Sequence, residues 1–458
     1  MKKLTSLLLT TVMAGSVLAA CAPAPTDNTT AAGTTAAGTT AAGTTAAGTT
    51  APATSDLAAE ISVSADKDWI PYYEAAIKRV TAKYPKSKIT IKDVGAFDVF
   101  TVIDSTDATN PDVPDVFAIP ADRMYGLNGK NALAKIDAKK IADEIGGFVD
   151  YDKNFGGNLK IGNDYFAIPM NIETLAVFTN NTNAKAASID VTKPVDFKDA
   201  KDLQIMIPAH DAWFGVSLAN SAGLNLLGKT ADGKLESDMT KDWADLGADK
   251  QAVINTLYEY WKVIDAQAPE IWDRDKAGSY IDEQFKDGGK AVWRIDGPWA
   301  IANLQKLSPD LGVAPLSNIT VNGKPLRHWQ GGWGLSINAR NEENADKMLL
   351  STELIKEILN PEYFEDFFSA TGKIMLNVPA EKYAASTKLT DIQKNVIGAI
   401  IESFKNAEAR PLFDEWGQVW PSWQNALLSW SSIKPATVED AYKALQDSFK
   451  TMMGNFGQ

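Results

Sequence analysis

Cysteine and histidine are scarce in this chain of 458 residues. Cys21 is the only cysteine, so no disulfide can form within the chain. The two histidines, His210 and His328, do not stand in a spacing typical of metal ligands. We therefore predict no metal site, no cofactor and no cysteine-based catalysis.

Basic residues are few relative to acidic ones. The 45 Lys and Arg face 58 Asp and Glu, which gives a net charge of −13. This balance argues against nucleic acid as a partner, and against broad contact between the folded part and an anionic membrane. The Gly-x-Ser-x-Gly elbow of serine hydrolases is missing too. Carboxylate pairs for glycoside hydrolysis stay open, because the sequence does not show their separation in space.

A signal for export stands at the N-terminus. Lys2 and Lys3 precede an apolar run over residues 4–17, which is too short for a mature membrane-spanning helix, and small residues stand directly before Cys21. This order resembles a bacterial lipobox, which implies cleavage before Cys21 and a lipid on that residue. We therefore predict a lipoprotein signal peptide over residues 1–20 and a lipid anchor on the extracytoplasmic face of the cell membrane, periplasmic or extracellular. The alternative is an ordinary secretory signal followed by a chance cysteine.

A low-complexity segment follows the cysteine. Residues 22–55 are rich in Ala, Thr, Gly and Pro, and the unit Ala-Ala-Gly-Thr-Thr occurs four times in succession over residues 31–50. Because this segment has no large apolar side chain to bury, it cannot offset the entropy lost on ordering. We predict a flexible tether over residues 21–57 that begins with the lipidated cysteine.

Helix and strand patterns begin after the tether. Residues 61–65 and 88–94 have strand patterns, and apolar residues recur every three or four positions over residues 69–84, which predicts a helix. A strand, helix, strand order favours a parallel pair. Further strands are predicted at residues 114–120, 164–169, 173–178, 203–207, 291–295 and 329–337, and further helices at 252–264, 280–286, 342–359 and 438–453. This mixture predicts an α/β protein with two lobes.

Tryptophan is the richest signal of function. All 13 Trp lie after the tether, and several stand beside Gly, Pro or short loops, namely Trp213, Trp299, Trp329, Trp333, Trp416, Trp420 and Trp423. A flat indole ring can stack on the apolar C–H face of a pyranose, while carboxylate and guanidinium groups bind its hydroxyls. Asp122 and Arg123 follow one predicted strand. Glu173 and Asp211 lie beside others. Each side chain alone has an ordinary explanation as core or surface, but together they predict a sugar-binding cleft.

The corner at residues 291–300 presents one of these rings. A short apolar strand ends at Gly297 and Pro298, and Trp299 comes at the start of the next helix. Ligands of α/β proteins bind beyond the ends of the strands. We therefore expect Trp299 to be a stacking platform rather than part of the core.

Four stretches of the chain carry a family likeness. They are residues 166–175 (FAIPMNIETL), the Gly-Pro-Trp corner at 297–299, residues 331–338 (GGWGLSIN) and the Trp-rich C-terminal region. In this order they resemble the extracellular solute-binding proteins of ABC importers, and within them the maltose/maltodextrin-binding type. The resemblance covers roughly residue 61 to the C-terminus.

The resemblance implies a two-lobed α/β fold of the periplasmic-binding-protein type with a hinge of three chain crossings. We place the crossings near residues 170–171, 330–336 and 383–386. Lobe 1 would then comprise residues 58–171 and 335–384, and lobe 2 residues 172–334 and 385–458. In such a fold the lobes close on the ligand.

The resemblance also implies a set of ligand-binding residues between the lobes, in which charged members bind sugar hydroxyls and aromatic members stack on the rings. The set consists of Lys67, Asp122, Arg123, Glu173, Asp211, Trp213, Phe214, Trp299, Trp333 and Trp420. Two departures from the family pattern concern the shape of the groove. Ile119 replaces an aromatic residue before the Asp-Arg pair, and Pro421 replaces one after Trp420.

The predicted function is capture of an oligosaccharide, above all maltose or a maltodextrin, for the permease subunits of an ABC transporter. We expect a monomer without catalytic residues. Two alternatives stay open. A surface-anchored glycan-degrading enzyme would use the same tryptophans and carboxylates. A receptor for a peptide or a polyamine would bind its ligand through carboxylates and cation–π contacts.

Overall fold

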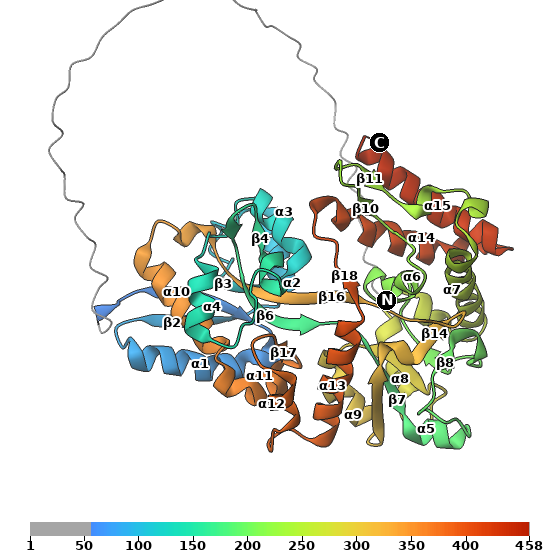
Figure 1. The fold of residues 1–458 in the computed structure, drawn as a ribbon, viewed down its shortest axis with the longest axis horizontal. Helices are drawn as coiled ribbons and strands as arrows, with labels where there is room; N and C mark the ends of the chain where they lie inside the picture. Colours follow the sequence, from blue (N-terminus) through green and yellow to red (C-terminus); the bar gives the residue numbers. More distant parts are fainter. Residues whose placement is uncertain (1–55, 458) are drawn as a thin grey trace, which may run out of the picture. The chain divides into compact units, whose positions relative to one another are not determined.

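A parallel β-α-β unit opens the described part of the chain, residues 56–457 of a computed structural model (Figure 1). Strands β1 (Glu60–Ala65) and β2 (Lys88–Asp93) pair in parallel, and helix α1 (Ile70–Lys83) connects them. Helix α1 packs against β2, and Pro85 stands just beyond its C-cap, where a helix cannot continue. The predicted strand, helix and strand are confirmed, with each boundary within one residue.

The large sheet is built around β16 (Trp329–Ile337). This strand runs antiparallel to β3 (Val116–Pro120) on one side and to β6 (Ile168–Glu173) on the other, and both neighbours are buried along their length. The order is β17-β6-β16-β3-β1-β2, and β18 also pairs with β16. The short strands β17 and β18 cover Ile374–Met375 and Glu408–Ala409. The sheet is mixed, because β1 and β2 are parallel whereas β16 is antiparallel to β3 and β6.

A second sheet has the order β13-β7-β12-β9. Its strands are β13 (Leu311–Pro315), β7 (Ala176–Asn180), β12 (Trp293–Asp296) and β9 (Ile205–Met206). Only Thr174 and Leu175 separate β6 of the large sheet from β7, so the chain passes directly from one sheet to the other. The predicted strands at 164–169 and 173–178 are displaced by a few residues. The reason is that β6 continues through two polar residues, Asn171 and Glu173, whose side chains are buried.

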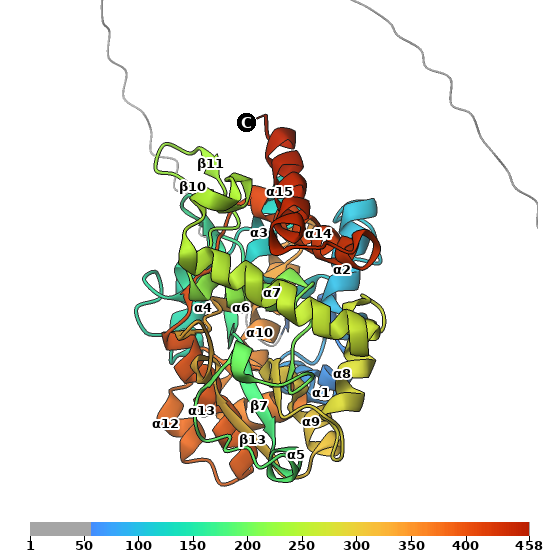
Figure 2. The same ribbon diagram turned by 90° about the vertical axis from the view of Figure 1, so that its right-hand side faces the viewer.

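Helices surround both sheets. Figure 1 shows the first group near the large sheet: α2 (Ala96–Ser105), α3 (Met124–Gly129), α4 (Ala138–Ile145), α10 (Ala345–Ile358), α11 (Phe364–Thr371) and α12 (Ala380–Ala384). The others are α5 (Asn181–Ala186), α6 (Ala212–Ser221), α7 (Ala248–Gln267), α8 (Ala277–Phe285), α9 (Ile301–Leu307), α13 (Asp391–Lys405), α14 (Val419–Ile433) and α15 (Val438–Asn455). Helix α15 packs on α14 and α7, a group that faces the viewer in Figure 2. The four further helices that the sequence predicts are confirmed as α7, α8, α10 and α15.

Three short β-ribbons complete the set of strands described in residues 56–457. They are β8 (Val195–Asp196) with β14 (Ile319–Val321) and β15 (Lys324–Pro325), β10 (Gly228–Lys229) with β11 (Leu235–Glu236), and β4 (Lys160–Ile161) with β5 (Asp164–Tyr165).

Three of the tryptophans that stand beside helix breakers belong to the core. Trp329, Trp416 and Trp423 are all buried. The ring of Trp423 lies against Gly215, where an added Cβ would come within 2.7 Å of it, and its Nε1–H donates to the carbonyl of Ala209 over 2.9 Å. A neighbouring glycine or proline therefore does not decide which way a ring points, since tertiary packing does.

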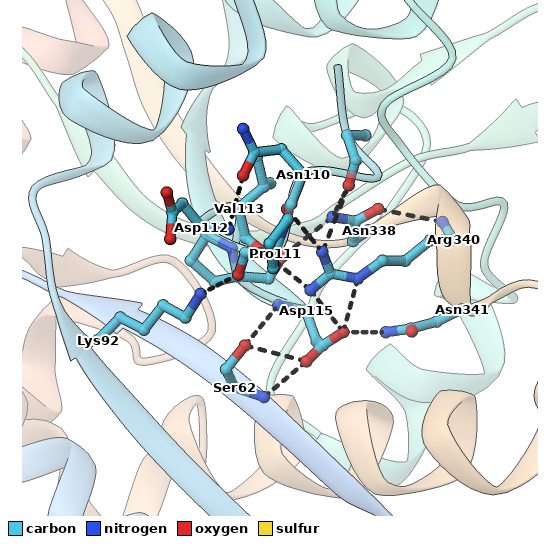
Figure 3. Close-up of polar contacts among 12 residues, drawn as sticks. Ser62, Lys92, Asn110, Pro111, Asp112, Val113, Asp115, Asn338, Arg340 and Asn341 are labelled. Atoms are coloured by element: carbon cyan, nitrogen blue, oxygen red, sulfur yellow. Dashed lines mark hydrogen bonds and ion pairs between the residues drawn. The ribbon is translucent and has the colours of Figure 1, made fainter. Parts of the chain in front are cut away.

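A buried ion pair ties the start of β3 to the end of β16, as Figure 3 shows. Arg340 donates from Nη2 to Asp115 Oδ1 over 2.9 Å and to the carbonyl of Val113 over 2.8 Å. The second oxygen, Oδ2, accepts from the backbone N–H of Ser62 in β1 over 2.7 Å. Burial by itself would raise the pKa of Asp115, but the Ser62 and Arg340 hydrogen bonds outweigh it and hold this pKa below its usual value. The pair joins three strands of the large sheet.

The predicted signal peptide, Cys21 and residues 21–55 of the predicted tether lie outside the described residues. Within residues 56–457, none of the helices combines the length and the apolar character needed to cross a membrane. The lobe boundaries and the three chain crossings stay predictions.

Candidate ligand-binding cleft

A cavity of about 860 Å³ lies where several strands of the large sheet end. Side chains reach it from the ends of β1, β3, β6 and β12, from β16, and from the first turns of α2 and α6. The lining residues are Asp66, Trp69, Gly95, Ala96, Phe97, Asp98, Phe100, Thr101, Asp104, Pro120, Asp122, Arg123, Glu173, Asp211, Trp213, Trp299, Trp333, Thr371, Lys373, Arg410 and Trp420. The size falls in the range of small-molecule sites, ~300–1,000 Å³.

The structure brings most of the predicted site residues together in this lining. They are Asp122, Arg123, Glu173, Asp211, Trp213, Trp299, Trp333 and Trp420. Lys67 and Phe214 do not line the cavity. Lys67 is exposed on a 3₁₀ turn, in which Asp66 and Trp69, three residues apart, share the cavity side. Phe214 follows Trp213 on helix α6 and is turned toward the core, because successive helical residues point about 100° apart.

Asp122 is paired with a cation from a distant segment. Its Oδ1 lies 2.7 Å from Nη2 of Arg410, and the two side chains are 9% and 4% exposed. The guanidinium of Arg410 lies 5.1 Å from the ring centroid of Trp213 and 5.5 Å from that of Trp329. A carboxylate and a guanidinium are therefore fixed side by side beside an indole that lines the cavity.

Arg123 points away from its neighbour Asp122. Its Nη2 lies 3.0 Å from Asp104 Oδ2, and its side chain is 40% exposed. Its guanidinium carbon lies 5.4 Å from the ring centroid of Phe100. Asp122 and Arg123 thus form two separate ion pairs, and both residues line the cavity.

A second buried ion pair joins Glu173 and Lys373. Glu173 Oε1 lies 3.3 Å from Lys373 Nζ, and Oε2 accepts from Nε1–H of Trp333 over 2.8 Å. The ammonium group of Lys373 also lies 4.5 Å from the ring centroid of Trp333 and 5.4 Å from that of Trp69. Glu173 and Asp122 each have a cationic partner. The two pairs therefore add no net charge to the cleft wall at those points.

Two further carboxyl groups of the lining stand at the starts of elements. Asp211 caps helix α6 by accepting from the backbone N–H of Trp213 over 2.9 Å. Burial raises the pKa of Asp211 above its usual value, and burial also raises the pKa of Asp66. Both groups can accept hydrogen bonds from ligand hydroxyls.

Trp213 is held from behind by a neutral histidine. The ring of His328 is buried, its centroid lies 4.4 Å from that of Trp213, and its Nε2 lies 2.7 Å from the Trp213 carbonyl oxygen. Burial lowers the pKa of His328 to about 3, so the imidazole is uncharged at neutral pH and its Nε2–H donates to that carbonyl. His328 thus has a structural role rather than a metal-binding one.

Two aromatic rings of the lining are open to solvent. Trp299 is 38% exposed and Phe97 is 67% exposed, whereas nearly all large apolar side chains elsewhere in the described residues are covered. The ring of Trp299 lies over Gly297, where an added Cβ would come within 2.1 Å of it. The centroids of Trp299 and Trp213 are 6.3 Å apart. The expectation that Trp299 is a platform rather than core agrees with this geometry.

Phosphate binding and metal binding find no support in the described residues. Residues 223–230 have the spacing Gly-x4-Gly-Lys-Thr of a phosphate loop. This segment neither follows a strand nor opens a helix, because Gly228 and Lys229 form ribbon β10, and Lys229 Nζ lies 3.1 Å from Glu415. No group of three or more His, Cys, Asp or Glu in residues 56–457 is arranged to hold a metal ion.

The chain matches one family of known proteins. Residues 75–395, more than half of its length, match the model of the bacterial extracellular solute-binding proteins. The chain belongs to this family. Its members are binding proteins, so the interpretation as a glycan-degrading enzyme is removed, and the protein acts outside the cytoplasm. No curated protein is matched by sequence.

Solved structures agree with the fold of this solute-binding protein. MalX from Streptococcus pneumoniae, in complex with maltopentaose, superposes with a TM-score of 0.65 at 21% identity, over 86% of this chain and all of the other. MalE from Listeria monocytogenes, in complex with maltose, gives 0.61 at 20% identity, over 86% and 98%. The GacH receptor of Streptomyces glaucescens, solved unliganded and with acarbose, gives 0.65 at 16% identity, over 87% and 100%. The predicted two-lobed α/β class is thereby confirmed.

The sequence-based prediction missed several residues that line this cavity. Asp66 directly follows β1, so the rule that selected Asp122 after β3 would also have found it. Lys373 directly precedes β17, and Arg410 directly follows β18. Each of these strands has two residues, too few for an alternating pattern, so the sequence offered no signal for either cation.

Proposed function

We propose that this solute-binding protein captures a neutral oligosaccharide of the maltose or maltodextrin type for the permease subunits of an ABC importer. One observation carries the proposal: the cleft combines solvent-open tryptophan with two buried carboxylates, each of which is balanced by a neighbouring cation. Trp299 offers a flat apolar face, and Asp122 and Glu173 are each ion-paired to a buried cation. A pyranose needs both an apolar surface and hydrogen-bonding groups, and it brings no charge.

The proposed contacts follow the position of each group. Trp299, Trp213 and Trp420 would stack on sugar rings. Asp211 and Asp66 would accept hydrogen bonds from hydroxyls, and their raised pKa values arise from burial that a bound ligand would increase further. The structural neighbours that are complexed with maltopentaose, maltose and acarbose support a carbohydrate as the ligand class.

Calorimetric titration of the purified protein with a panel of ligands tests the proposal. The panel contains maltose, maltotriose and maltopentaose, a β-linked glucan trisaccharide of the same size, a polyamine and a short peptide. We expect saturable binding of at least one neutral glycan and no binding of the polyamine or the peptide. Binding of the polyamine alone would instead support the alternative receptor, since acidic residues outnumber basic ones in the lining.

The proposed architecture has two lobes, residues 58–171 with 335–384 and residues 172–334 with 385–458, which close on the sugar. Closure should reduce the radius of gyration in X-ray scattering when the sugar is added. We also propose that the protein is a monomer, which scattering measures in the same experiment as the forward-scattered intensity.

The proposed location is the outer face of the cell membrane, through a lipid on Cys21. Metabolic labelling with a radioactive fatty acid should label the wild-type protein, and Cys21→Ala should remove both the label and the membrane association. A Cys21→Ala protein that stays in the membrane fraction would contradict lipid anchoring but would leave the sugar site untouched.

A further inference from the structure

Arg410 is a buried cation of the cleft that no motif assigned. Its side chain is 4% exposed, and the rings of Trp213 and Trp329 lie 5.1 Å and 5.5 Å from its guanidinium carbon. A guanidinium is planar and stacks well on aromatic faces, so these two rings restrict its position. Arg410 therefore forms a fixed positive charge at one place in the cleft wall.

The positive charge of Arg410 balances one carboxylate, that of Asp122. Asp122 Oδ1 lies 2.7 Å from its Nη2, and Asp122 forms no other ion pair within residues 56–457. Arg123, the neighbour of Asp122 in sequence, cannot replace Arg410, because it is engaged with Asp104 at 3.0 Å. A buried carboxylate without a cation costs several kcal/mol, so the charge state of this part of the cleft depends on Arg410.

The same ion pair is incompletely hydrogen bonded. Asp122 Oδ1 and the Nε and Nη1 of Arg410 are covered from solvent, yet none of them has a hydrogen-bond partner in the described chain. The 2.7 Å approach therefore provides charge balance without the two parallel hydrogen bonds of an ideal carboxylate–guanidinium pair. Both groups retain hydrogen-bonding capacity that a small rearrangement would make available to a hydroxyl group.

We infer that Arg410 is a positioning residue that sets the charge preference of the site, by fixing Asp122 and cancelling its charge so that a neutral polyhydroxyl ligand is selected over a cationic one. This inference rests on the proposed function and deepens it. Without the guanidinium, Asp122 is left buried with an unbalanced charge. An amine on the ligand would then supply the missing cation, and the preference of the site would reverse.

The test compares maltotriose with an analogue in which one hydroxyl group is replaced by an amino group. Both ligands are titrated into the full protein and into Arg410→Met, which keeps a long apolar side chain between the two rings. The measured quantity is the ratio of the two dissociation constants. We expect Arg410→Met to shift this ratio toward the amino analogue by at least ~10-fold, the scale on which an unpaired buried charge changes binding.

Two comparisons separate this role from a general packing role. Arg327→Met removes an exposed arginine that is paired with Glu408 at 3.0 Å, and it should leave the ratio unchanged. The double variant Asp122→Asn/Arg410→Met has lost both charges and should therefore show the wild-type ratio. A loss of packing between the rings would persist in the double variant.

A second variant keeps the test decisive if Arg410→Met does not fold, as judged by thermal unfolding. Asp122→Asn alone leaves the guanidinium without its carboxylate and should shift preference the opposite way, toward a maltotriose that carries one carboxylate. An unchanged ratio in folded Arg410→Met, an unchanged preference between maltotriose and its carboxylate analogue in folded Asp122→Asn, or a double variant whose ratio stays shifted from the wild-type value overturns the inference. If the wild-type protein binds no glycan, the proposed function itself is wrong. That result is obtained without any variant.

Discussion

Replacement of Trp299 by alanine isolates the platform on which the proposed sugar would stack. A tryptophan side chain offers roughly 250 Å² of surface. Because Trp299 is 38% exposed, about 90 Å² of it is free for a ligand to cover. At ~25 cal/mol per Å², that contact is worth about 2 kcal/mol, or roughly a thirty-fold increase in Kd when it is lost.

The covered part of the ring predicts that Trp299→Ala also affects folding. Roughly 160 Å² of the side chain packs against the protein, so its loss should lower the free energy of unfolding by up to about 4 kcal/mol. Calorimetry with the tightest-binding glycan measures Kd, and urea unfolding measures stability. Trp243→Ala is the matched control, because Trp243 is a partly buried tryptophan outside the cavity that packs against Tyr442 at 5.4 Å.

The combination of results decides between the platform and the core interpretation. A weakened affinity in a variant that remains folded at the assay temperature identifies Trp299 as a platform. Unchanged affinity with a large loss of stability would show instead that the ring belongs to the core, and would refute the reasoning. Trp299→Phe should retain part of the affinity, because a smaller ring still covers part of the sugar.

Three further predictions follow from the packing. Gly297→Ala places a Cβ within 2.1 Å of the Trp299 ring, so the ring must move and glycan affinity should fall roughly ten-fold in calorimetry. Trp423→Ala opens a cavity in the core and should reduce the free energy of unfolding by ~3–5 kcal/mol in urea, with Kd little changed if the protein stays folded. Asp115→Asn should reduce stability by ~3 kcal/mol at pH 7. Since the pKa of Asp115 is lowered in the folded protein, its contribution is present above the unfolded value near 3.8 and is lost as the pH falls further, so the mutant and wild-type unfolding curves should converge at acid pH.

Long elements with one buried face could be predicted from the sequence. The β-α-β unit at residues 60–93 and helix α15 have apolar residues at the spacing of their secondary structure, so local pattern and tertiary packing agree. The predicted position of strand β6 was displaced by a few residues, because Asn171 and Glu173 interrupt its apolar pattern. Glu173 lines the cleft, and its buried carboxylate is stabilised by Lys373, which only the fold brings near.

The site was predictable where polar residues follow recognisable strands, as Asp122 does after β3. Its cations were not, because Lys373 and Arg410 stand beside two-residue strands whose pairing depends on β6 and β16 far away in sequence. The tryptophans show the same limit. Trp299 and Trp423 both have a proline within two residues, yet one is open to the cavity and the other is fully buried.

The measurement that tests the central claim most directly is calorimetric titration of the purified wild-type protein with maltotriose, with spermidine as the charged comparison. The open tryptophan and the two buried ion pairs of the cleft predict saturable one-to-one binding of maltotriose, or of a longer maltodextrin, and no heat of binding from spermidine. Saturable binding of spermidine with no response to any neutral glycan would contradict the account.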